Sequence, residues 1–129
     1  MRSAFVDTSL LAAIALVERT AHAARRKLAA FDVLMASPLL EAEMLSLLRR
    51  EGSQAEGRVG PWLAGLEWVS PSRPLSPEIG AVLDAGYLRG ADCWHLACAL
   101  YFSPDPAEIS FLTLDERQRA VAKTLGFKT

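Results

Sequence analysis

The sequence predicts an α/β fold, a three-layer α/β/α sandwich with a mostly parallel central sheet of four to five strands. Short apolar runs alternate with longer segments whose apolar residues recur at helical spacing. The short runs are apolar enough to form the buried strands of a parallel sheet. The chain of 129 residues is 51% hydrophobic and 22% charged, so we expect one domain over residues 1–129 with a substantial core.

Caps and turn residues divide the chain into the expected elements. These are, in order, strand 4–6, helices 9–18 and 20–31, strand 33–37, helix 38–51, a weak helix within 53–66, strand 66–70, helices 77–88 and 91–102, strand 109–113 and helix 115–126. Thr20 is a suitable N-cap for the second helix. Residues 127–129 are expected to add at most a short last strand.

Proline and glycine fix the boundaries of the middle helices. Pro38 suits the first turn of a helix that Ser37 caps and Gly52 ends. We expect the next helix to break near Gly60 and Pro61, because proline removes a backbone donor and crowds the preceding turn.

The later helices follow the same signals. Ser76 and Pro77 open one helix as its cap and first residue, Gly90 separates that helix from the next, and Gly126 ends the last. Apolar strands alternating with helices in this way favour parallel strand pairing, with functional sites outside the carboxyl ends of the strands.

Composition excludes a strongly basic nucleic-acid binder. The formal net charge is −1, so nucleic-acid binding would depend on local patches such as residues 25–27 and 49–50, which otherwise are solvated helix faces. Cys93 and Cys98 lie five residues apart in a predicted helix, which disfavours a disulfide and fits a reducing cytoplasm. No apolar run approaches the roughly 18 residues that a membrane span needs.

Two aspartates follow predicted strands directly. Asp7 comes after strand 4–6 and Asp115 after strand 109–113, so both are expected at the carboxyl edge of the sheet. If the strands are neighbours, the carboxylates repel each other unless a cation lies between them, and oxygen ligands of this kind suit Mg²⁺ or Mn²⁺. The alternative is that each aspartate only caps the helix that follows.

Asp92 is a third candidate. It shares a helix face with Leu96 and Ala99, which indicates the core side, where a carboxylate should be paired or bound. The alternative is a cap after Gly90. His95 lies one turn further on and is either placed to orient Asp92 or is a hydrogen-bonded histidine at the edge of the core.

Helix 38–51 offers two glutamates. Glu41 and Glu43 each lie roughly 80° from the centre of its apolar face, on opposite sides, so periodicity does not choose between them.

With these residues in place, the chain resembles the PIN-domain family, and within it the VapC-like toxin ribonucleases. The resemblance covers nearly the whole chain and rests on four motifs in order: FVDTSLL, ASPLLEAEMLSLLRR, RGADCWHLACAL and FLTLDERQRAVAKTLGF. It implies a parallel sheet flanked by helices and an acidic metal site.

The resemblance also assigns site residues. By position it implies a catalytic, metal-binding set of Asp7, Glu43, Asp92 and Asp115, with Thr8, Ser9, Thr113 and Glu116 in supporting places. Glu43 is preferred over Glu41 because the family pattern has a serine six residues before the glutamate, and Ser37 stands there. Many relatives carry an acidic or polar residue just after the last motif aspartate, where Glu116 follows directly.

The implied function is a metal-dependent endoribonuclease that uses Mg²⁺ or Mn²⁺. As the toxin of a toxin–antitoxin pair it would act on RNA in the cytoplasm and be held by a cognate antitoxin protein. The alternative is a non-catalytic PIN-like binding or scaffold module. An aspartyl-phosphate enzyme centred on Asp7 is disfavoured, because Ser9 stands where such phosphatases carry a second aspartate. No phosphate-binding glycine motif is present.

The resemblance further implies a homodimer. The apolar stretch LLAAIALV at residues 10–17 has Ala12, Ala13 and Ile14 on more than one side of the helix. We therefore expect apolar surface there that a partner covers.

Overall fold

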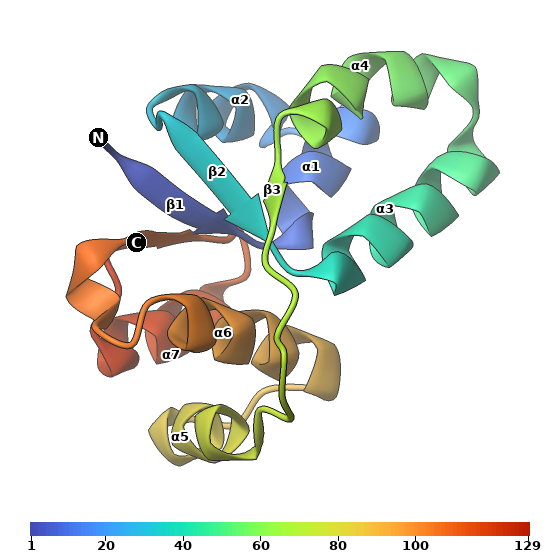
Figure 1. Ribbon diagram of the computed structural model, residues 1–129. Coiled ribbons are helices and arrows are strands. Elements are labelled where there is room, and N and C mark those ends of the chain that lie inside the picture. Colours follow the sequence, from blue (N-terminus) through green and yellow to red (C-terminus); the bar gives the residue numbers. More distant parts are fainter.

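The computed structural model describes residues 1–129 and confirms the predicted α/β/α sandwich (Figure 1). Four parallel strands form the sheet in the order β3-β2-β1-β4. The strands are β1 (Ser3–Val6), β2 (Val33–Ala36), β3 (Glu67–Trp68) and β4 (Ser110–Leu112). The helices are α1 (Thr8–Ala15), α2 (Ala21–Ala29), α3 (Pro38–Glu51), α4 (Ser53–Ala64), α5 (Ser76–Ala85), α6 (Gly90–Phe102) and α7 (Glu116–Leu125), with a 3₁₀ turn at Pro106–Glu108.

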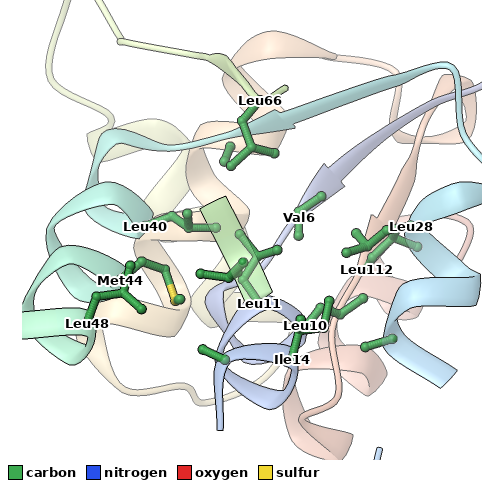
Figure 2. Packing of buried hydrophobic residues seen from close by; sticks show 14 of the residues in the cluster. Val6, Leu10, Leu11, Ile14, Leu28, Leu40, Met44, Leu48, Leu66 and Leu112 are labelled. Carbon is green, nitrogen blue, oxygen red and sulfur yellow. The ribbon is translucent and has the colours of Figure 1, made fainter. Parts of the chain in front are cut away.

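Helices α1 to α4 cover one face of the sheet and α5 to α7 the other (Figure 1). Consecutive strand residues point to opposite faces, so Val6 packs with the first group of helices while Phe5 packs with the second. Figure 2 shows the first cluster, in which Leu11 of α1 lies toward Leu40 of α3 and Leu10 lies toward Leu28 of α2. In the second cluster, the rings of Phe5 and Phe111 stack with their centroids 6.1 Å apart.

The sheet places the ends of β1 and β4 side by side. Val6 is in register with Leu112, and the backbone N–H of Asp7 donates to the carbonyl of Leu112 at 2.9 Å. The chain runs from β1 outward through β2 to β3 and then returns to the other side of β1. This reversal makes the gap beyond β1 and β4 a topological switch point, where ligands bind in open α/β sheets.

Helix α4 differs from the sequence prediction, because it continues through Pro61 instead of breaking there. Ala55 and Val59 are buried in the first cluster, so packing holds the helix together across the lost hydrogen bond.

Helix α1 is shorter than predicted and is more completely covered. It ends at Ala15, and Val17 adopts a left-handed φ of 52°, which is strained for a β-branched residue and stops the helix. Ala13 and Ile14 are fully buried beneath neighbouring helices. The predicted apolar surface on this helix was therefore wrong, and exposed apolar groups remain only at its end, at Leu16 and Val17.

Several smaller features also deviate. Strand β3 has only two residues, and the C-terminal segment adds a single parallel bridge between Lys128 and Ser110 in place of a strand. Thr20 makes no side-chain cap, whereas Gly126 ends α7 in the left-handed conformation with φ 109°. Both cysteines are free and buried, and burial raises the pKa of Cys98 to about 12. No helix combines the length and apolar character needed to cross a membrane.

Candidate active site

Asp7 lies at the end of β1 and is the most deeply buried carboxylate of the site, with 4% of its surface exposed. It caps α1, since Oδ2 accepts from the backbone N–H of Ser9 at 3.1 Å. The Thr113 hydroxyl lies 3.2 Å from the same oxygen, and Gln118 Nε2 donates to Oδ1 at 3.3 Å. Capping therefore accounts for one contact of Asp7, and β4 and α7 supply the others.

Asp115 stands beside Asp7 at the end of β4. It caps α7 by accepting from the backbone N–H of Gln118 at 2.8 Å, and its own N–H donates to Thr113 Oγ1 at 3.0 Å. The carboxylate is exposed, so its second oxygen remains open to a ligand. Asp115 is therefore a helix cap that also lies at the carboxyl edge of the sheet, as its place after the strand predicted.

Gln118 joins three of the acids, whereas the resemblance had assigned the supporting place after Asp115 to Glu116. Its buried side chain donates to Asp7 Oδ1 and to the backbone carbonyl of Asp92, the latter at 3.1 Å. Its Oε1 lies 2.7 Å from the Thr113 hydroxyl. The spacing from Asp115 to Gln118 matches the pattern of a helix cap followed three residues later by glutamine, which was the available signal.

Glu43 reaches the site from α3, whereas Glu41 is exposed on the same helix. Glu43 Oε1 accepts from the Thr8 hydroxyl at 2.7 Å and from His95 Nε2 at 2.8 Å. The hydrogen bond from His95 holds the pKa of Glu43 below its usual value, against the opposing effect of burial.

His95 and Ser37 form a buried support behind Glu43. The Ser37 hydroxyl makes no cap on α3 and instead lies 2.8 Å from His95 Nδ1. Because a carboxylate only accepts, Nε2 donates to Glu43, while Nδ1 on the other side of the ring is held at hydrogen-bond distance by the Ser37 hydroxyl. Of the two alternatives for His95, the buried, hydrogen-bonded histidine is the one observed, because its ring contacts Glu43 and Ser37. Its Nε2 also lies 3.9 Å from Asp7.

Asp92 lies in the first turn of α6 and is not the cap, since Arg89 occupies the N-cap position. The pKa of Asp92 is raised above its ordinary value, first by burial and then by the negative charges of Asp7 and Asp115. The carboxylates of Asp7 and Asp115 are therefore close enough to repel that of Asp92.

The supporting residues divide into two groups. Thr8 and Thr113 contact the acids, and Ser9 Oγ accepts from the backbone N–H of Leu114 at 2.9 Å, which ties α1 to the end of β4. Glu116 points away from the site, with 87% of its side chain exposed and its carboxylate paired with Arg119 at 3.1 Å.

Asp92 and Asp115 open into a cleft with a volume of about 410 Å³. Tyr87, Leu88, Arg89 and Arg117 complete its lining. A larger hollow of about 600 Å³ lies at the opposite edge of the sheet, at the amino ends of the strands. None of the four acids lines it, and its lining includes the basic residues Arg2, Arg26, Lys27 and Lys128. Chemistry involving the carboxylates therefore belongs to the smaller cleft.

The donor set fits a hard divalent cation by its chemistry. Four carboxylates supply oxygen ligands, and burial together with the negative charges of Asp7 and Asp115 raises the pKa of Asp92. As the side chains stand, no three of them meet closely enough to hold an ion together. Asp7 and Glu43 are held by side-chain hydrogen bonds, whereas Asp92 and Asp115 line the cleft.

The comparisons with known proteins agree with this geometry. The sequence profile of the PIN domain matches residues 4–124. The chain belongs to the PIN-domain family. It is also similar to "Ribonuclease VapC46" of Mycobacterium tuberculosis (strain ATCC 25618 / H37Rv), with 30% identity over 126 residues that cover 98% of this chain and 95% of the relative. The resemblance inferred from the four motifs is thereby confirmed.

In this PIN domain, Asp92→Asn should raise the melting temperature of the metal-free protein by about 2 to 5 °C at neutral pH. Folding raises the pKa of Asp92, so the folded state binds the proton more tightly than the unfolded state. Stability is therefore lost as the pH rises from the ordinary value through the folded value, and asparagine escapes that loss.

Thermal melts in EDTA at pH about 7.5 and about 4 test this expectation. The two proteins should differ at the higher pH and converge at the lower, where Asp92 of the wild type is protonated. Equal melting temperatures at the higher pH would show that no repulsion acts on Asp92. Glu51→Gln, at the exposed end of α3, is the matched control.

Proposed function

We propose that this PIN-domain protein is a metal-dependent endoribonuclease, the toxin of a toxin–antitoxin pair, which hydrolyses RNA phosphodiester bonds. The observation that carries the proposal is the gathering of Asp7, Glu43, Asp92 and Asp115 at the switch point of the sheet. These acids come from four separate segments of the chain. Similarity to a protein named as a ribonuclease supports the same reaction.

The four carboxylates would hold one or two Mg²⁺ or Mn²⁺ ions, in keeping with the preference of these cations for oxygen ligands. When bound, such an ion supplies Lewis-acid stabilisation of the phosphate and lowers the pKa of water. Asp7 and Glu43 contribute fixed oxygens, because their hydrogen bonds with Gln118, Thr8 and His95 restrict their rotation.

Asp92 is placed to orient the attacking water. Its carboxylate lines the cleft, where water has access to it. Asp7 is less suited to that role, since Ser9, Thr113 and Gln118 already surround its oxygens. Removing Asp92 should therefore affect cleavage as well as metal binding.

The partners in this proposal are RNA as substrate, a cognate antitoxin protein that holds the toxin inactive, and a second copy of the chain in a homodimer, all in the cytoplasm. A non-catalytic PIN-like binding module is the alternative. The presence of all four acids favours the nuclease, because a binding module has no need to keep mutually repelling carboxylates together.

The decisive experiment is cleavage of single-stranded RNA by the purified protein with about 1 mM Mn²⁺ and with EDTA. We expect endonucleolytic products with the metal and none with EDTA. Sequencing the new RNA ends after induced expression would then give the cleavage position. Binding of RNA without cleavage under both conditions would instead support the non-catalytic module.

Metal binding has an independent readout in stability. A ligand that binds only the folded state raises its stability by RT ln(1 + [L]/Kd), about 2.7 kcal/mol at a concentration of one hundred Kd. Millimolar Mn²⁺ should therefore raise the melting temperature of the wild type, and Asp115→Asn should reduce that rise. Asparagine still caps α7, so this variant keeps its fold. A melting temperature of the wild type that does not change with Mn²⁺ would contradict the metal site.

A further inference from the structure

We propose that the cleft formed by Tyr87, Arg89 and Arg117 is a subsite for single-stranded RNA next to the four acids. In it the two arginines bind the phosphates that flank the scissile bond, and Tyr87 stacks on an unpaired base. This inference rests on the proposed function and names how its substrate is held.

The two arginines are free to bind a ligand. The arginine salt bridges of the protein involve Arg50, Arg73 and Arg119, whereas Arg89 and Arg117 are exposed and line the cleft with Asp92 and Asp115. A planar guanidinium binds phosphate through two parallel hydrogen bonds, which suits a position beside a phosphodiester chain.

The charge of the site requires such cations. The chain carries a formal net charge of −1, and four carboxylates gather where an RNA strand must lie. A bound divalent ion compensates the acids at the scissile phosphate, but the neighbouring phosphates still meet a negative surface. Arg89 and Arg117 stand on that route, because they share one cleft with the acids.

Tyr87 is presented on a fixed loop. The residue is 69% exposed, while the adjacent Leu88 is 4% exposed and anchors the loop in the core. Gly86 packs so closely on α7 that an added Cβ would lie 2.8 Å from Val121 Cγ2. An exposed aromatic ring on an anchored loop is a stacking platform for a nucleobase, and stacking needs bases that are not already paired.

Fluorescence anisotropy with a labelled single-stranded RNA of about ten nucleotides tests the subsite. The measurement uses the full chain carrying Asp115→Asn in EDTA, so binding is recorded without cleavage. Against this parent, Arg89→Ala with Arg117→Ala should weaken binding at least tenfold at about 50 mM KCl and reduce the slope of log K against log[KCl] by about 1.4, or 0.7 for each lost phosphate contact.

Tyr87→Ala should weaken RNA binding at least fivefold, because stacking of a base on an aromatic ring usually contributes roughly one kcal/mol or more. The slope of log K against log[KCl] should not change, because stacking releases no counterions. Tyr87→Phe keeps the ring and should restore most of the affinity. Arg25→Ala on α2, across the sheet from the cleft, is the control for loss of positive charge alone.

Any of three results would overturn the subsite. They are unchanged RNA affinity and salt slope in the double arginine variant, an equal loss of affinity in Arg25→Ala, and no RNA binding by the parent. Equal binding of the same sequence as a duplex would overturn the stacking by Tyr87. A different result would contradict the proposed function and leave the subsite intact: wild-type protein that binds RNA through these residues but cleaves none of it with Mn²⁺.

Discussion

Glu43→Gln is expected to lower RNA cleavage at least a hundredfold, about 2.7 kcal/mol, whereas Glu41→Gln should change it less than threefold. Substituting a residue that only supports a metal ligand typically lowers metal affinity or activity 10- to 100-fold. Substituting a ligand itself should therefore lower activity at least about 100-fold. Glutamine keeps the shape of Glu43 and can still accept from Thr8 and His95, but it loses the charge that attracts the cation.

The two substitutions form a matched pair on one helix, and only Glu43 faces the site. Cleavage of one RNA at fixed Mn²⁺ gives the rates, and circular dichroism confirms that both variants fold. When the melting temperature is measured at increasing Mn²⁺ concentration, only Glu43→Gln, and not Glu41→Gln, should show weaker metal binding than the wild type. If Glu41→Gln were the inactive variant, the assignment of this helix would be displaced by two residues.

The fold was predictable because short apolar strands and capped helices leave few arrangements. The sequence predicted the bounds of α3 directly, since Pro38 and Gly52 terminate it by local chemistry. Local chemistry failed where packing decided the outcome. Helix α4 survives Pro61 because Val59 is buried, and strained Val17 ends α1 early.

The site shows the same division. Asp7 and Asp115 were predictable as residues of one sheet edge, because each follows a strand and parallel strands share one carboxyl edge. That β1 and β4 are paired is a result of the structure. The choice between Glu41 and Glu43 was not available from periodicity, since both flank the apolar face equally. The contacts of Gln118 and His95 join segments distant in sequence, so their partners emerge only from the packed sheet and helices.

His95→Ala is expected to lower cleavage 10- to 100-fold, about 1.4 to 2.7 kcal/mol, although His95 itself need not touch the substrate. The imidazole holds Glu43 on one side and Ser37 on the other, each at 2.8 Å, inside a site where His95 is 1% exposed. Without it Glu43 rotates away, and the buried Ser37 hydroxyl loses its partner. The melting temperature should therefore fall as well.

A double-mutant cycle separates positioning from general loss of stability. If His95 acts through Glu43, adding His95→Ala to Glu43→Gln should cost little further activity, because the carboxylate that His95 positions has already been replaced by an uncharged amide. His95→Gln, whose amide can donate to Glu43, should recover part of the rate. Additive losses in the double variant, or equal losses for alanine and glutamine at position 95, would show that His95 contributes only to the core. Cleavage rates compared at a temperature well below every melting transition keep unfolding out of the measurement.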